Sequence, residues 1–195
     1  WYKRLVLTGN TLEMAIEYII EDNIDVEVEW KFTISSKFLT SYIALVQDKE
    51  VNVELEKWWS LKFTTASSNT KFKWISAEKF PVIPNLVPNN PLKIQSKDLK
   101  SAIEKTLFST ADGAVRPVLA WIYLKAAEGK LTFASTDSFR LSEFTVNTKT
   151  EGSHPTVIIP KKTASELSRI VSDEEEKMPI DLYFFENQLL AIRWN

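Results

Sequence analysis

Two stretches of the chain decide the fold: Val157-Ile-Ile-Pro-Lys-Lys162 and Phe32-Thr-Ile-Ser-Ser-Lys37. Each reads as a short strand that runs into a helix, and each expected helix is followed by an acidic loop and a pair of strands. The helices match at an offset of 125 residues and the strands after them at an offset of 129. This self-similarity predicts a repeated strand–helix–strand–strand unit. The alternative is a chance likeness between two amphipathic pieces.

The rest of the sequence predicts short strands and few helices. A first helix is expected at 36–46, capped by a serine at 35 or 36. A second opens at Ser96 with an apolar stripe that includes Leu99 and Ile103, and a third spans about 162–171. Expected strands cover 3–8, 13–20, 24–29, 31–35, 50–56, 60–65, 70–76, 118–126, 130–135, 140–147, 156–160, 179–185 and 188–193.

A proline-rich stretch separates the two halves. Residues 80–91 contain four prolines, which exclude a helix and favour extended backbone. We interpret this stretch as an interdomain linker. Residues 1–90 would then form one domain with its linker, and residues 91–195 a second.

The composition excludes several kinds of chemistry. The chain has no Cys, which rules out disulfides and thiolate catalysis, and no apolar run approaches the ~18 residues of a membrane helix. The single histidine, His154, lies in a polar loop and is expected to be exposed. No phosphate-binding glycine loop, metal-ligand cluster or nucleophile motif is visible, so we expect no catalytic residue, no metal and no cofactor.

Five segments, taken in order along the chain, resemble a single family. They are residues 7–14, 75–84, 99–109 together with 115–119, 136–141, and 157–162. Thr136-Asp-Ser-Phe-Arg-Leu141, for example, is similar to the motif Thr-Asp-Gly-(His/Tyr)-Arg-Leu of the bacterial DNA polymerase III beta subunits, the sliding clamps. Each segment is weak alone, but together they cover essentially the whole chain.

The resemblance implies an α+β fold, the DNA clamp fold. In this fold, repeated strand–helix–strand units place antiparallel sheets outside and helices along the DNA channel. The implied function is a processivity factor rather than an enzyme: a cytoplasmic, replisome-associated protein that encircles duplex DNA without sequence preference. The implied partners are the polymerase III catalytic subunit, the clamp loader and other clamp-binding peptides, with a homodimeric ring at full length and no membrane. A β-rich protein-interaction scaffold without DNA binding is the alternative.

On the clamp template, both domains are expected to be incomplete. Residues 1–90 would be a partial N-terminal domain without its first strand–helix–strand. Residues 91–195 would be the central domain without its last strand. With the third domain absent, this chain alone would not close a ring.

Basic residues on the helices are the expected DNA contacts, because sliding requires phosphate contacts that do not read bases. A ring can be basic inside and acidic outside, so the formal net charge of −2 is no objection. For each residue, a purely solubilising role is the alternative. The candidates on the helices are Lys37, Lys97, Lys100, Lys161, Lys162 and Arg169, and the resemblance adds Arg116 in the loop after the second helix.

The resemblance also implies half of a pocket for partner peptides, with its other wall on the third domain. Apolar walls with one arginine suit a peptide that carries a hydrophobic anchor. Ser138 stands where the family has Gly, and Phe139 where it has His or Tyr. The alternative is that Leu119 and Leu141 are core residues. The pocket positions are Leu119, Thr136, Ser138, Phe139, Arg140 and Leu141.

Tryptophan is frequent and glycine rare, with seven Trp against four Gly, although average glycine usage is roughly 7%. Glycine is usual in the family at or near six of these positions. We hypothesise that several of the tryptophans are UGA codons that the cell reads as glycine. Natural tryptophans, or platforms for base stacking, are the alternatives, and the codons in the gene decide. The positions are Trp30, Trp58, Trp59, Trp74, Trp121 and Trp194.

Overall fold

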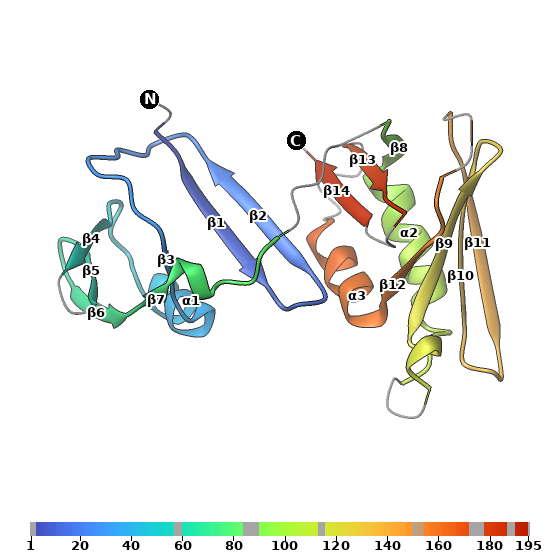
Figure 1. The fold of residues 1–195 in the computed structure, drawn as a ribbon, viewed down its shortest axis with the longest axis horizontal. Coiled ribbons are helices and arrows are strands. Elements are labelled where there is room, and N and C mark those ends of the chain that lie inside the picture. Colours follow the sequence, from blue (N-terminus) through green and yellow to red (C-terminus); the bar gives the residue numbers. More distant parts are fainter. Residues whose placement is uncertain are drawn as a thin grey trace. The chain divides into compact units, whose positions relative to one another are not determined.

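The structure, a computed structural model, divides the chain into two compact units, Trp1–Pro84 and Asn85–Asn195. Figure 1 labels the elements of both units, and each unit is described by itself below. No helix among the described residues has the length and apolar content that a membrane crossing requires. The structure describes residues 3–56, 60–83, 90–112, 116–149, 152, 154–171, 178–186 and 190–194.

Unit 1 consists of small antiparallel sheets and one short helix. A two-stranded hairpin and a three-stranded sheet are joined by a segment that contains the helix, and a third pair of strands is only two residues long. The elements are β1 (Leu5–Asn10), β2 (Ala15–Ile20), β3 (Phe32–Thr33), α1 (Ser36–Ile43), β4 (Asn52–Glu56), β5 (Ser60–Thr64), β6 (Asn69–Lys73), β7 (Ile75–Ser76) and the 3-10 turn η1 (Ala77–Lys79). The sheets are β1-β2, β3-β7 and β4-β5-β6.

Burial in unit 1 is sparse. Among its described residues, only the side chains of Leu61 and Phe63 in β5 are buried hydrophobics. Tyr42 of α1 packs edge-on against Phe63 and Phe72, with ring centroids 5.5 Å away in both cases. The helix α1 itself has no buried residue. An aromatic cluster therefore holds α1 to the three-stranded sheet.

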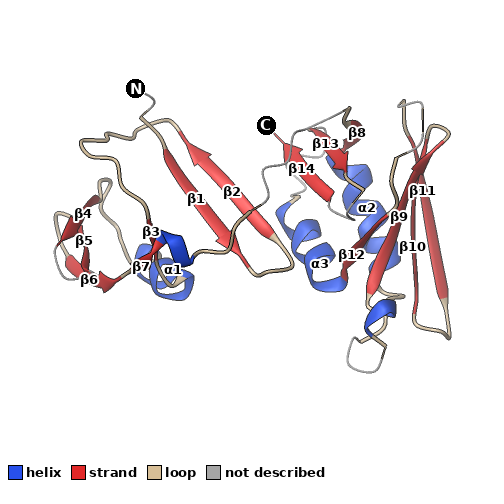
Figure 2. Ribbon diagram, viewed as in Figure 1, coloured by secondary structure: helices blue, strands red, loops and turns tan. Residues whose placement is uncertain are grey.

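Unit 2 has two antiparallel sheets and two longer helices (Figure 2). The strand orders are β11-β10-β9-β12 and β14-β13-β8. The elements are β8 (Leu92–Gln95), α2 (Ser96–Leu107), η2 (Pro117–Leu119), β9 (Trp121–Ala127), β10 (Lys130–Thr136), β11 (Leu141–Asn147), β12 (Val157–Pro160), α3 (Lys161–Ile170), β13 (Pro179–Phe184) and β14 (Leu190–Trp194).

The core of unit 2 lies between these helices and sheets. The helices α2 and α3 contact each other, α2 also packs on β10, β11 and β8, and α3 on β12 and β9. Of the predicted stripe of α2, Leu99, Ala102 and Ile103 are buried and Leu107 is half-buried, and α3 buries Ala164 and Leu167. In β9, Ile122 and Leu124 are buried whereas Tyr123 between them is exposed. This alternation leaves one face of the sheet for the core and the other for solvent.

The predicted repeat is confirmed in its element order. The order β3, α1, β4, β5 in unit 1 matches β12, α3, β13, β14 in unit 2. In both units the two strands after the helix pair antiparallel. Two similar stretches of sequence therefore do form the same series of elements.

Several local predictions were wrong. No strand forms at 24–29, because alternating Val and acidic residues supply a strand pattern but no neighbouring strand to pair with. The strand expected at 31–35 is only β3, and that at 118–126 begins at Trp121 after the turn η2. The strand β8 was missed, because its four residues depend on pairing with the distant β13. The first helix ends at Ile43, after which tighter turn bonds carry the chain to Val46.

His154 is half-buried, not exposed as predicted. Its backbone N–H donates to the carbonyl of Ala126 at 3.0 Å, and its ring lies 5.2 Å from that of Phe184. A contact with the second sheet, invisible in the local sequence, covers it.

The backbone at three of the tryptophans does not require glycine. Trp30, Trp74 and Trp121 do not appear among the described non-glycine residues that have positive φ. Trp30 instead packs on Phe32, with ring centroids 4.9 Å apart. The adjacent pair at positions 58 and 59 lies outside the described residues. Backbone geometry thus gives the codon hypothesis no support at Trp30, Trp74 and Trp121.

Candidate functional site: a helix groove and a hairpin turn

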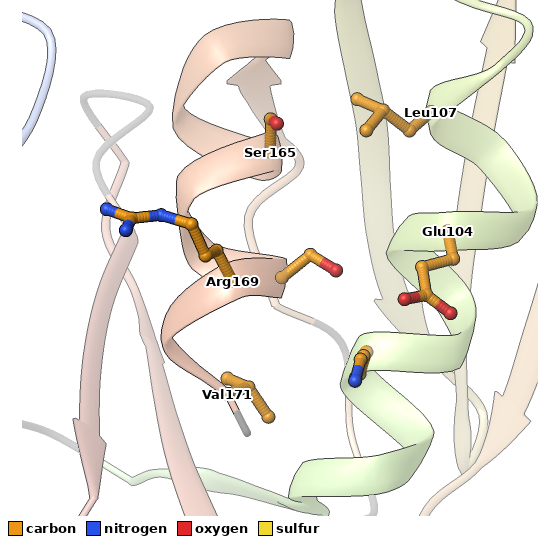
Figure 3. A pocket seen from close by; sticks show the side chains of 7 residues that line it. Glu104, Leu107, Ser165, Arg169 and Val171 are labelled. Atoms are coloured by element: carbon orange, nitrogen blue, oxygen red, sulfur yellow. The ribbon is translucent and has the colours of Figure 1, made fainter. Parts of the chain in front are cut away.

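A shallow groove lies between α2 and α3 (Figure 3). The stripe of α2 that faces the core leaves Lys97, Lys100 and Glu104 on another side, since these residues are three and four apart. In the same way α3 presents Lys162, Ser165 and Arg169. The groove measures about 560 Å³ and is lined by Lys100, Glu104, Leu107, Ser165, Ser168, Arg169 and Val171.

The groove brings together two of the predicted DNA contacts, Lys100 and Arg169. Lys97 and Lys162 are exposed on the same two helices but do not line it. Together α2 and α3 carry six basic and three acidic side chains, whereas the whole chain has 24 basic and 26 acidic. The two helices are therefore more basic than the rest of the chain. Lys37 is exposed on α1, in unit 1.

Arg169 is paired within its own helix. Its Nη2 and Nε donate to Oε2 of Glu166 at 2.7 and 3.0 Å. The Arg169 side chain is 79% exposed, and exposed pairs of this kind contribute only ~0–1 kcal/mol. A phosphate could compete for this guanidinium at little cost.

Two other predicted DNA contacts turn toward different partners. Nη1 of Arg116 donates to Oγ of Ser138 at 2.8 Å. Nζ of Lys161 lies 2.6 Å from Oδ1 of Asp112. The hydrogen bond and charge of Lys161 hold the pKa of the Asp112 carboxyl below its ordinary value. The structure thus groups Arg116 with the predicted peptide pocket, and neither residue lines the groove.

The turn between β10 and β11 is built by its own side chains. Oγ1 of Thr136 donates to the carbonyl of Arg140 at 2.7 Å and accepts the N–H of Ser138 at 3.1 Å. Oδ1 of Asp137 accepts the N–H groups of Phe139 and Arg140, both at 3.0 Å, and Oδ2 accepts Nε of Arg140 at 2.9 Å. The bond from the Phe139 N–H, more than the others, lowers the pKa of Asp137, and desolvation partly opposes it.

Apolar side chains are exposed around this turn. Phe139 is 97% exposed and Leu141 is 71% exposed, so the alternative that Leu141 is a core residue is wrong. Leu119 is half-buried. The guanidinium of Arg140 lies 5.6 Å from the centre of the Phe108 ring, and Oγ of Ser142 donates to the carbonyl of Lys105, which ties β11 to the end of α2.

Sequence reasoning missed three parts of this surface. Phe108 is exposed and lies beside Arg140 of the turn, Val118 is exposed in η2, and Asp137 organises the turn. Phe108 could have been found, because it follows the apolar stripe of α2 without belonging to it. Among the residues that the structure describes, no group of three His, Asp or Glu side chains could hold a metal ion.

Ser138 has φ of +79°, in the left-handed region that favours glycine. This is the position where the motif has Gly. We expect Ser138→Gly to raise the free energy of unfolding by about 0.5–1 kcal/mol, since it relieves the Cβ strain. Urea titration measures the change. Ser138→Ala is the control: it keeps the Cβ and loses the hydroxyl that bonds Arg116, so it should not stabilise. Equal changes in the free energy of unfolding for the two variants would contradict the prediction that the Cβ of Ser138 strains the backbone.

Family comparison supports the resemblance of the sequence. A family model described as "DNA polymerase III beta subunit, central domain" matches residues 93–194. The beta sliding clamp of Staphylococcus epidermidis is 28% identical over 192 residues, which are 95% of this chain and 50% of the relative. That of Staphylococcus aureus is 27% identical over the same shares. The chain spans about half the length of these curated relatives.

Solved structures share the fold. The beta subunit of DNA polymerase from Streptococcus pyogenes has a TM-score of 0.89 and 22% identity, over 100% of this chain and 52% of that one. The DNA polymerase sliding clamp of Bacillus subtilis has a TM-score of 0.87 and 20% identity, over 99% of this chain and 54% of that one. These likenesses confirm the predicted α+β clamp fold.

Proposed function

The chain belongs to the DNA polymerase III beta subunit family, and on this basis we propose that it is a segment of a DNA sliding clamp. Such a ring encircles duplex DNA and tethers the replicative polymerase and other partners to it. The observation that carries the proposal is the match of residues 93–194 to the central domain of the family, which includes both helices of the basic groove. The role is non-catalytic and cytoplasmic, at the replisome.

The outward sides of α2 and α3 form the proposed DNA surface. Lys97, Lys100, Lys162 and Arg169 all lie on these helices and are exposed or half-buried, with flexible side chains that can reach phosphates. Phosphate contacts carry no sequence information, which suits a protein that must move along DNA. Lys37, Arg116 and Lys161 stay predicted contacts that the groove geometry does not support.

The turn between β10 and β11 forms the proposed partner surface. Phe139 and Leu141 offer exposed apolar area, and Arg140 offers a cation held in place by Asp137. A short peptide with a hydrophobic anchor would bury these side chains. The proposed ligands are peptides of the polymerase III catalytic subunit, the clamp loader and other clamp-binding proteins.

Residues 1–90 are proposed to be part of the N-terminal clamp domain, and 91–195 most of the central one. In unit 2, α3 packs on α2 and buries two residues. Its counterpart α1 buries none among the described residues, and the β1-β2 hairpin exposes Leu7 and Tyr18. In a whole N-terminal clamp domain, a further strand–helix–strand comparable to the one that contains α2 would cover Leu7 and Tyr18. With a third domain, two copies would close the ring head to tail.

A topological experiment tests the proposal on the full-length protein. The clamp is loaded on nicked circular DNA, and its retention at high salt is measured before and after the circle is cut. We expect retention on the circle and loss from the linear product, because a ring slides off free ends. Equal retention on both forms would overturn the clamp function and favour a scaffold without DNA encirclement.

A further inference from the structure

Among the described residues that line the groove between α2 and α3, one carboxylate, Glu104, accompanies the cations Lys100 and Arg169. Glu104 lies one helical turn from Lys100 on the side of α2 that faces α3, and both line the groove with Arg169 (Figure 3). The side chain of Glu104 is exposed. A DNA phosphate that approaches Lys100 therefore also approaches a negative charge.

Arg169, the second cation that lines the groove, does not fully offset the negative charge of Glu104. The guanidinium of Arg169 is bonded to Glu166, 2.7 Å from Nη2 to Oε2, so its charge is partly neutralised by a carboxylate of its own helix. In the view of Figure 3, the Arg169 side chain extends to the side of α3 away from Glu104. Phosphates in the groove would meet partly neutralised cations rather than a purely basic surface.

We propose that Glu104 weakens the hold of the groove on phosphates and so limits the strength of each contact between this segment and DNA. This inference rests on the proposed function of the groove as a DNA surface. A sliding protein needs contacts that attract the backbone but break easily at every step. A carboxylate one turn from a lysine provides this, since its negative charge repels the phosphate that the lysine attracts and so reduces the net attraction.

The test compares Glu104→Gln with the unchanged chain in binding to a short fluorescent DNA duplex, by anisotropy. The variant keeps the size of the side chain and removes its charge. We expect it to bind about two- to fivefold more tightly at low salt, from the Coulomb energy of one repulsion in water. The difference should vanish at roughly 0.5 M salt, where charges are screened over a few ångströms.

Glu143→Gln is the matched control. Glu143 is exposed on β11 and does not line the groove. Its replacement changes the net charge by the same amount as Glu104→Gln and leaves the groove unchanged. Equal tightening by both variants, or none by Glu104→Gln, would overturn the inference. Lys100→Ala distinguishes the role of Glu104 from the proposed function of the groove. If Lys100→Ala binds DNA less tightly while Glu104→Gln has no effect, the groove still binds DNA and only the role of Glu104 is wrong. If neither the unchanged chain nor any variant binds DNA at any salt concentration, both proposals are wrong.

Discussion

Phe133→Ala should reduce the stability of unit 2 by about 3–5 kcal/mol, the usual cost of emptying a buried phenylalanine site. Phe133 is 0% exposed and is among the largest fully buried side chains. It lies in β10, which pairs with β9 on one side and β11 on the other, so hydrogen bonds to two strands hold the backbone of the cavity site in place. Urea titration followed by circular dichroism gives the change. Whole domains are stable by only about 5–15 kcal/mol, so this single change would remove a large part of the free energy of unfolding.

Phe139→Ala is the control for this prediction, since it deletes the same atoms at a site that is 97% exposed. Its free energy of unfolding should stay within about 0.5 kcal/mol of the unchanged chain. Similar losses in the two variants would contradict the burial pattern that separates the core from the proposed partner surface.

Reversal of both groove cations, Lys100→Glu with Arg169→Glu, should weaken binding to duplex DNA at least about tenfold at low salt. Each phosphate contact adds about 0.9 to the slope of the logarithm of affinity against the logarithm of salt concentration, so the loss of two contacts should lower that slope by about 2. Anisotropy titrations at several salt concentrations give both values.

Lys125→Glu with Lys130→Glu is the matched variant on the sheet. These lysines are exposed on β9 and β10. They alternate with the buried residues Leu124 and Leu131, so they lie on the face of the sheet away from the helices. The change in net charge is the same, so a general effect of charge would appear in both pairs. If the sheet variant loses as much affinity as the groove variant, the helices are not the DNA surface.

The elements of unit 2 could be predicted well from the sequence, and those of unit 1 less well. The stripe from Leu99 to Ile103 and the alternation in β9 are local periodicities that burial then reproduces. The strand expected at 24–29 had the same kind of alternation but found no partner strand. A strand exists only when another supplies its hydrogen bonds, and a single segment does not reveal whether one is near.

The candidate site divides in the same way. Helical spacing predicted that Lys97 and Lys100 lie away from the core, and the structure agrees. Spacing could not predict the partners of Arg116 and Lys161, because Ser138 and Asp112 are 22 and 49 residues away along the chain.

The sequence by itself determined the repeated order of elements, the apolar faces of the helices and the family, because these depend on spacing and residue type along one segment. Only the tertiary structure decided which cations share the groove, and that Arg116 bonds Ser138 of the turn instead of lining the groove. These features arise where segments distant in the chain meet, and the energy of such contacts depends on geometry that no single segment contains.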